Sequence, residues 1–304
     1  MSDVFNLLLF QNTLRTATPV VLCALGCLMT ERVGIMNIGV EGMMLMGAFF
    51  AVLGSYLYGS WVMGLVFVIV LGILLGLFYY LFSVKFKSDE FVIGIALNIL
   101  AGGLTVFLLR TLFGVKGSFS GPGIVPLPTL HFAWLESIPV LGTILSGNTL
   151  LVYISWILVL VCWLLLYKTP LGFHLRASGE APEALRAAGK NPDRMKMLAS
   201  VLCGIMASLS GAHLSLGYLT MFSENMSASR GFVAVACVIF GGGNPPRVFL
   251  AALLFGFIDA LGLRMQKYIP ADITASAPYV ITVLMMIVVV LMKRRKKQAV
   301  KADV

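Results

Sequence analysis

Among the polar side chains within long apolar stretches of the sequence, the candidates for a functional role are Asn37, Glu41, Asn98, His213 and Asp259. An ionisable side chain at the centre of a bilayer costs about 2.5 to 3.5 kcal/mol on insertion scales, so it usually faces a cavity or a partner. Buried carboxylates also serve as proton relays, which makes Glu41 and Asp259 candidates for proton coupling. For Asp259 we favour a structural role, paired with a backbone group or a cation of a neighbouring helix.

The first of these stretches contains a predicted helix break. Asn37 and Glu41 are four residues apart and would share one face of a helix, but Gly39 and Gly42 interrupt that helix. Backbone groups freed at membrane depth are tolerated only where protein or a watery cavity satisfies them. We therefore predict that these four residues line a solute path, together with the aromatic ring of Phe232. The alternatives are a position at the cytoplasmic interface, where polar groups cost little, and simple packing of Phe232.

The composition identifies the class of protein that must position these groups. The chain is 59% hydrophobic and only 12% charged, with a mean hydropathy of +0.97, which is typical of a polytopic membrane protein. The predicted fold is an all-α bundle of about nine transmembrane spans, some of them broken. The apolar runs cover residues 12–30, 35–57, 61–84, 91–113, 149–167, 197–219, 231–241, 248–265 and 277–292. The short run at 231–241 ends in glycines and prolines, so it is the most uncertain span in the count.

The basic residues report topology and not a nucleic-acid partner. Assigning the loops to alternate sides places 16 of the 22 Lys and Arg residues on one side and six on the other. The positive-inside rule then puts the C-terminus in the cytoplasm and, with nine spans, the N-terminus outside. The basic tail at residues 293–304 is interpreted as a cytoplasmic anchor on anionic lipid.

A charged insert at residues 168–196 separates two apolar runs on the cytoplasmic side. Ser178 and Gly179 can open a helix, Pro182 fits its first turn, and Gly189 suits its end, which leaves about two turns. So short a helix is not stable alone, and it needs a partner surface. A solvated loop is the alternative. The candidate docking residues are Gly179, Glu180, Pro182, Glu183, Ala184, Arg186, Ala187 and Gly189.

Other features are interpreted as structural. Gly72 and Gly76, and likewise Ala252, Gly256 and Ala260, form small-residue stripes that allow close helix packing. The five cysteines and three histidines show no spacing typical of a metal site, and no catalytic set is found. Residues 114–148 contain several prolines and yet are apolar, which suits a segment that lies at the membrane interface or covers the mouth of the bundle.

Three motifs together resemble one family. Residues 34–48, Gly-Ile-Met-Asn-Ile-Gly-Val-Glu-Gly-Met-Met-Leu-Met-Gly-Ala, are similar to the signature of nucleoside-type permeases in the superfamily of branched-chain amino acid and simple sugar permeases. Ribose-type relatives usually carry Asp-Leu-Ser-Val-Gly there, and the difference favours nucleosides over free pentoses. Residues 179–189 resemble the coupling helix of ATP-binding-cassette (ABC) importer permeases. The resemblance continues through residues 231–236 and 241–245.

The resemblance implies that residues 1–304 form one permease domain of an ABC importer in a bacterial cell membrane, with 168–196 as the coupling segment. Its implied partners are a second permease subunit in a heterodimer, an ABC ATPase subunit and an extracytoplasmic solute-binding protein or lipoprotein, which residues 114–148 could receive. Gly189-Lys190-Asn191 is not a phosphate loop, so this chain is expected to bind no cofactor and to be no enzyme, with ATP used by the partner subunit. The alternatives are a proton-coupled secondary transporter of a small polar solute and an ABC permease for a simple sugar.

Overall fold

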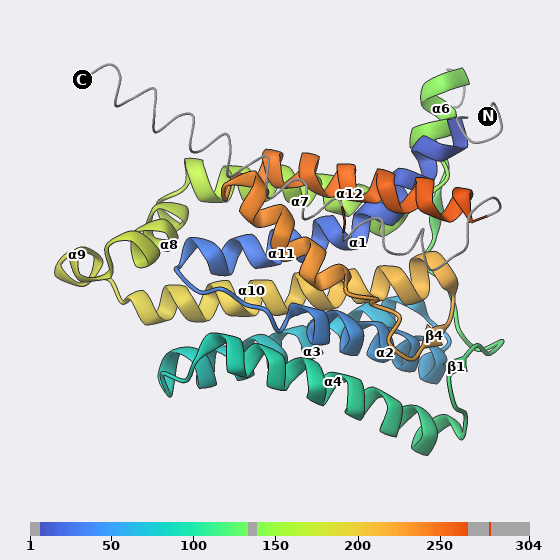
Figure 1. Cartoon of the computed structure of the whole chain (residues 1–304), viewed down its shortest axis with the longest axis horizontal. Coiled ribbons are helices and arrows are strands. Elements are labelled where there is room, and N and C mark those ends of the chain that lie inside the picture. Colours follow the sequence, from blue (N-terminus) through green and yellow to red (C-terminus); the bar gives the residue numbers. More distant parts are fainter. Residues whose placement is uncertain (1–6, 133–138, 267–279, 281–304) are drawn as a thin grey trace.

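The computed structural model describes residues 7–132, 139–266 and 280, and it is a helical bundle with two very short antiparallel ladders (Figure 1). The helices are α1 (Leu7–Arg32), α2 (Val40–Tyr58), α3 (Trp61–Tyr80), α4 (Glu90–Phe113), α6 (Pro139–Leu145), α7 (Leu150–Lys168), α8 (Pro170–Glu180), α9 (Pro182–Ala187), α10 (Pro192–Ala212), α11 (Arg230–Gly241) and α12 (Pro245–Met265). Two π-helical turns extend α3 and α10, namely η1 (Leu81–Lys85) and η2 (His213–Leu219). The all-α prediction is confirmed.

Within the described residues, seven helical segments are long and apolar enough to cross a membrane, and α11 is a shorter apolar helix. They account for eight of the nine predicted runs. The run at 277–292 and the basic tail at 293–304 lie outside the described residues, so the count of nine stays a prediction. Helices are expected here because hydrocarbon offers no partners for backbone N–H and C=O groups.

The spans differ in how deeply they are buried. In α1, α2 and α10 most of the apolar window is buried inside the chain, at 89%, 72% and 67%, whereas α3, α4, α7 and α12 bury only 28 to 33%. The outer helices therefore present large apolar side chains to their surroundings, for example Val92 and Ile99 on α4 and Leu250 on α12. This distribution fits a lipid-facing ring around three central helices.

Glycines allow two outer helices, α3 and α12, to approach the central helices closely. A Cβ atom on Gly72 would lie 2.7 Å from the Cα of Ile205 in α10, and one on Gly256 would lie 2.6 Å from the Cα of Ala17 in α1. Gly76 also lies against the backbone of Ser200. The predicted packing role of the small-residue stripes is confirmed at these contacts.

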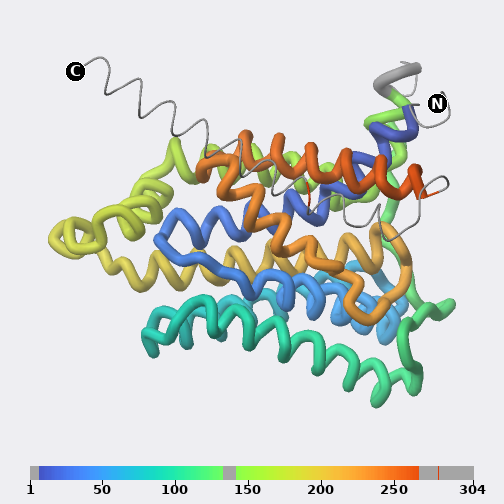
Figure 2. The backbone as a smooth tube through the Cα atoms, viewed as in Figure 1, coloured from blue at the N-terminus to red at the C-terminus, as the bar shows by residue number. Residues whose placement is uncertain are grey.

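Two helices begin inside the bundle and not at its ends. Figure 2 shows the link between α1 and α2 turning back from the end of α1 into the bundle, where α2 starts at Val40. α11 starts after the turn at residues 224–229 and has 12 residues, which gives a length of about 18 Å. Since a bilayer core is about 30 Å thick, α11 crosses only part of it.

The two ends of the bundle carry different structures. α8 and α9 project at one end, and the strands and α6 lie at the other (Figure 1). There, β1 (Ser118–Phe119) pairs with β4 (Phe222–Ser223), and β2 (Thr129–Leu130) pairs with β3 (Asn148–Thr149). Between them, Leu127 is buried and its N–H donates to the carbonyl oxygen of Leu216 at 3.0 Å. The described part of residues 114–148 thus covers this end of the bundle, as expected, though residues 133–138 lie outside the description.

Candidate functional site

The helix break lies earlier than the sequence indicated. Residues 35–38 are non-helical, Gly39 is the N-cap of α2, and Gly42 lies within its first turn. The predicted break is therefore present before Gly39, and it removes the shared helix face of Asn37 and Glu41. Gly42 does not interrupt a helix, so that part of the expectation is wrong. The physical reason is that the Asn37 side-chain oxygen accepts from the Gly39 N–H at 2.9 Å, a local bond that competes with helix formation.

Asn98 on α4 satisfies the backbone groups that this break frees. Its Oδ1 accepts from the Gly42 N–H at 2.7 Å, and its Nδ2 donates to the carbonyl oxygen of Ile38 at 3.1 Å. Gly39 is packed against Leu97 and Gly94 of the same helix. α4 therefore fixes the start of α2. A polar residue in an apolar run was expected to face a partner, and the partners of Asn98 are these two backbone groups.

Glu41 binds the N-terminus of α11. Its Oε1 accepts from the Ser229 N–H at 2.8 Å and its Oε2 from the Gly231 N–H at 2.6 Å, and the residue is only 9% exposed. A Cβ atom on residue 231 would lie 2.6 Å from Oε2, so the approach requires glycine there. A carboxylate at this position satisfies two N–H groups of a helix start and also complements the positive end of the helix dipole.

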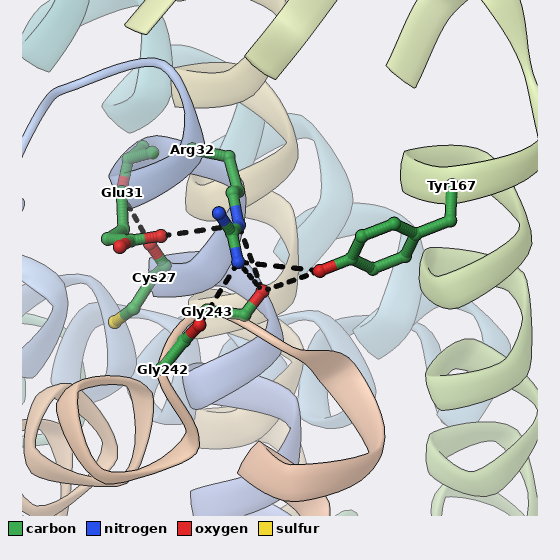
Figure 3. A network of polar contacts seen from close by, with 7 residues as sticks. Cys27, Glu31, Arg32, Tyr167, Gly242 and Gly243 are labelled. Atoms are coloured by element: carbon green, nitrogen blue, oxygen red, sulfur yellow. Dashed lines mark hydrogen bonds and ion pairs between the residues drawn. The ribbon is translucent and has the colours of Figure 1, made fainter. Parts of the chain in front are cut away.

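Arg32 binds the other end of the same helix (Figure 3). Its Nε donates to the carbonyl oxygen of Gly243 at 2.9 Å and its Nη2 to that of Gly242 at 3.2 Å. Nη2 also lies 3.4 Å from the Tyr167 hydroxyl, and a Glu31 carboxylate oxygen lies 3.6 Å from Nε. A cation at a helix C-terminus complements the negative end of the dipole. α11 is thus held at both ends by charged residues that flank the break between α1 and α2.

Two cavities lie against α11. The first, of about 250 Å³, is at its N-terminal end and is lined by Glu41 and Gly42 of α2, Asn98 of α4 and Phe232, which is 43% exposed. The second, of about 270 Å³, lies between Asn37, Glu31 and the α11 residues Val235 and Val238. The structure therefore brings Glu41, Gly42 and Phe232 together and places Asn37 at the second cavity.

The remaining polar groups of the apolar runs have partners of their own. Asp259 on α12 lies 3.1 Å from the Arg230 guanidinium in the first turn of α11, so the expectation of a cationic partner is confirmed. Arg230 was one of the six basic residues assigned to loops on the outer side, but it is the first residue of α11 and is paired within the bundle. His213 is fully buried, with Nε2 3.1 Å from the carbonyl oxygen of Arg15 and Nδ1 3.4 Å from the Thr149 hydroxyl.

The charged insert at residues 168–196 forms two helices where one was expected. Ser178, Gly179 and Glu180 belong to the last turn of α8, so the expectation that Ser178 and Gly179 open a helix is wrong. α8 begins instead at Pro170, and its N-cap Thr169 accepts from the Gly172 N–H at 3.1 Å through its hydroxyl. The Ser178 hydroxyl donates to the carbonyl oxygen of Pro192. Pro182 does start α9, and Gly189 follows its end with φ of +76°, as expected.

α9 exposes most of the predicted docking residues. Leu185 is buried, whereas Ala184, Ala187, Glu183 and Arg186 are exposed, the last two as an ion pair of 2.6 Å. A groove of about 440 Å³ runs between α8 and α9. It is lined mainly by apolar atoms of Phe173, Ala177, Ala181, Ala184, Leu185 and Ala188, with Glu180, Arg176, His174 and Lys190 beside them. An exposed apolar groove on a short helix pair is suited to a protein partner.

The insert contacts the break between α1 and α2 directly. A Cβ atom on Gly179 would lie 2.5 Å from the carbonyl oxygen of Arg32 and 2.9 Å from the nitrogen of Gly34. Gly34 itself has φ of +79°, which favours glycine. The end of α8 therefore packs, backbone against backbone, on the turn that leads to Asn37.

Comparisons with known proteins agree with this architecture. The family model described as branched-chain amino acid transport system / permease component matches residues 9–290. The guanosine ABC transporter permease protein NupQ of Bacillus subtilis is 33% identical over 288 residues, which cover 90% of this chain and 88% of that protein. The nucleoside ABC transporter permease protein NupC of Lactococcus lactis is 31% identical and covers 91% and 90%.

Not every similar protein is named for nucleosides. The putative glucose ABC transporter permease protein TsgC13 of Haloferax volcanii is 34% identical over 262 residues, which cover 85% of this chain and 78% of that protein. No solved structure matches the chain.

Proposed function

The chain belongs to the family of permease components of branched-chain amino acid transport systems, and on that premise we propose that it is the permease subunit of an ABC importer that takes up nucleosides. The observation that carries the substrate class is that relatives named for guanosine and for nucleosides align with about nine tenths of the chain. The signature at residues 34–48 supports the same class.

The solute path runs along α11 in this proposal. Glu41, Gly42 and Phe232 line one cavity, at the N-terminal end of α11. Asn37, which precedes Gly39 in the break, lines the other cavity. An exposed aromatic ring at such a site can stack on a nucleobase. Because α11 is anchored by Glu41 and Arg32 to both sides of that break, a movement of the break would move α11 as well.

The ATPase subunit docks on the exposed surface of α8 and α9. The residues we assign to this contact are Gly179, Glu180, Pro182, Glu183, Ala184, Arg186, Ala187 and Gly189. Gly179 is exposed and also lies against Gly34, so it connects the docking surface to the break, whereas Ala184 lines the groove. ATP is bound and hydrolysed by that partner, and the movement reaches the solute path through the Gly179–Gly34 contact.

Further partners complete the importer. Bacillus subtilis and Lactococcus lactis each contain two similar permease proteins with the same named substrate class, which supports a heterodimer of two permease chains. A solute-binding protein or lipoprotein would dock at the opposite end, over the described parts of residues 114–148. In this arrangement the protein resides in a bacterial cell membrane with a cytoplasmic C-terminus.

Uptake of a simple sugar is the second candidate, and the similarity to a putative glucose permease favours it. Proton coupling has less support. Both Glu41 oxygens accept backbone hydrogen bonds, and Asp259 is paired with Arg230, so each carboxylate is engaged in holding α11.

The proposal is tested with the complete importer in proteoliposomes. We expect uptake of ribonucleosides but not of glucose or free ribose, dependence on ATP and the partner ATPase, and no loss when the proton gradient is collapsed. Glucose uptake without nucleoside uptake would favour the sugar permease. Nucleoside uptake by this chain alone, driven by an imposed proton gradient, would favour the secondary transporter.

A further inference from the structure

The cavity at the N-terminal end of α11 contains a buried hydroxyl that the fold does not use. Ser227 lines this cavity and is fully buried, and its Oγ has no hydrogen-bond partner among the described residues. A buried hydroxyl without a partner is costly, and such a group in a native protein calls for an explanation. The backbone of Ser227 is fixed, since its carbonyl oxygen accepts from the Arg230 N–H at 3.0 Å.

The polar groups around Ser227 suit a hydroxyl-bearing ligand. Each Glu41 oxygen accepts one backbone N–H and retains further capacity to accept, and Nδ2 of Asn98 donates one of its two protons to Ile38. A hydroxyl group both donates and accepts, so it can pair with any of these residues. At about 250 Å³ the cavity lies below the roughly 300 to 1,000 Å³ of sites that enclose a whole drug-sized ligand, so it would take part of a solute.

We propose that the Ser227 hydroxyl binds a hydroxyl group of the ribose of the transported nucleoside in this cavity, with Glu41 and Asn98 beside it. This inference rests on the proposed function, because it presumes a nucleoside as the solute. Ribose then lies against the start of α11 and the base lies toward Phe232, which lines the same cavity and is partly exposed.

The test compares Ser227→Ala with Ser200→Ala in the complete importer. Ser200 on α10 is the matched control, because its Oγ is also buried and without a partner among the described residues, but it is not among the residues that line this cavity. Uptake rates of one ribonucleoside and of its 2′-, 3′- and 5′-deoxy analogues are measured at saturating solute, so that the affinity of the binding protein does not enter.

An analogue that lacks the hydroxyl bound by Ser227 loses one hydrogen bond. We therefore expect the wild-type importer to carry the ribonucleoside about two- to tenfold faster than at least one analogue. Ser227→Ala should bring these two rates together, and Ser200→Ala should leave their ratio unchanged. An unchanged ratio in Ser227→Ala, or equal rates for all analogues in the wild type, overturns the inference while nucleoside transport stands. A wild-type importer that carries no nucleoside removes the proposed function and this inference with it.

A labelling measurement covers the case in which Ser227→Ala fails to fold. Ser227→Cys and Ser200→Cys are placed in a functional background without the five native cysteines. During ATP-driven turnover, a small polar thiol reagent should modify only the first, and the ribonucleoside should slow that reaction more than the discriminated analogue does. Equal protection by all the nucleosides, or protection by none, overturns the assignment.

Discussion

Gly179 at the end of α8 lies directly against Gly34 in the turn after α1. A Cβ atom on Gly34 would be 3.4 Å from the Cα of Gly179, and one on Gly179 would be 2.9 Å from the nitrogen of Gly34. The two residues are far apart in the sequence, and they join the exposed helix pair α8–α9 to the break that precedes α2. A docked partner that displaced α8 would therefore press on this turn without an intervening side chain.

The first prediction concerns this contact. Gly179→Ala inserts a methyl group where backbone atoms of Arg32 and Gly34 already stand, so it should destabilise the protein by about 1 to 3 kcal/mol, the usual range for overpacking. The measurement is thermal unfolding of the purified protein in detergent. Gly103→Ala on α4 is the control, since no atom beyond the neighbouring backbone of its own helix lies within 4 Å of its added Cβ, and helix propensity favours alanine there. Equal melting temperatures for the two variants would contradict the prediction.

The second prediction concerns the groove between α8 and α9. Ala184 is exposed and lines this groove, so Ala184→Glu should block a docked ATPase by bulk and by charge. Uptake should fall to background while membrane insertion and folding are kept. Ala184→Ser is the matched control, because it adds one oxygen atom and should retain most uptake. Normal uptake and solute-stimulated ATP hydrolysis in Ala184→Glu would exclude this surface as the docking site.

Much of the fold was predictable, because long apolar runs have few structural options in a bilayer. Eight predicted runs are helices, and the short run at 231–241 is the half-length helix α11. α8 was missed although Thr169-Pro170 is a helix-start signal. Ser178 was taken for a cap, but its hydroxyl bonds to the carbonyl oxygen of Pro192, which is 14 residues away. Local signals could not distinguish these two uses of one serine.

The candidate site was predicted only in part. Glu41, Gly42 and Phe232, which were predicted to line one solute path, share a cavity, and their role in transport stays a prediction. The two backbone amides that Glu41 binds are about 190 residues away in sequence. Arg32 was counted only as a topology signal, and its partners lie in the glycine run at 241–243. That glycine run, at the end of a short apolar stretch, is the sequence feature that could have indicated free carbonyl groups at the end of α11. Pairings of this separation follow from the packing and not from any local pattern.

The third prediction tests the role of Glu41 as the anchor of α11. In Glu41→Gln one oxygen is replaced by an NH₂ group, which cannot accept from a backbone N–H, so one charge-assisted bond is lost and two donors face each other. We expect a loss of about 2 to 3 kcal/mol in stability. Glu90→Gln is the control, because Glu90 also accepts a backbone N–H, that of Met36 at 2.8 Å, but this hydrogen bond is exposed to solvent, so water can replace it. The stabilities of the two variants are compared by their melting temperatures in detergent. A Glu41→Gln protein as stable as Glu90→Gln would refute the anchoring role.

The fourth prediction concerns the opposite end of α11. Arg32 bonds through two nitrogens to the carbonyl oxygens of Gly242 and Gly243, a fork that the single ammonium group of lysine cannot reproduce. Arg32→Lys should therefore lower both uptake and protection of the α11 amides from hydrogen exchange. Tyr167→Phe removes only a hydroxyl at 3.4 Å from Arg32 and should have a smaller effect. A lysine variant with wild-type exchange would show that the charge alone holds this end.

The last prediction is that Asn37, Glu41 and Phe232 line the path of the solute. Cysteines are introduced singly at these positions in a functional background without the five native cysteines, all of which are buried and free. Phe232→Cys should react with a small polar thiol reagent in the resting protein, because Phe232 is 43% exposed. At 2% and 9% exposure, positions 37 and 41 should react appreciably only during ATP-driven turnover, when the path opens.

The control for this labelling is Ala234→Cys, on the same helix but fully buried. It should stay unreactive in every state. Transported nucleoside should slow the reaction at positions 37, 41 and 232, since a solute in the path competes with the reagent for the same space. If turnover leaves positions 37 and 41 as inert as position 234, Asn37 only bonds to the Gly39 N–H at the start of α2, Glu41 only holds α11 in place, and the solute crosses elsewhere in the complex.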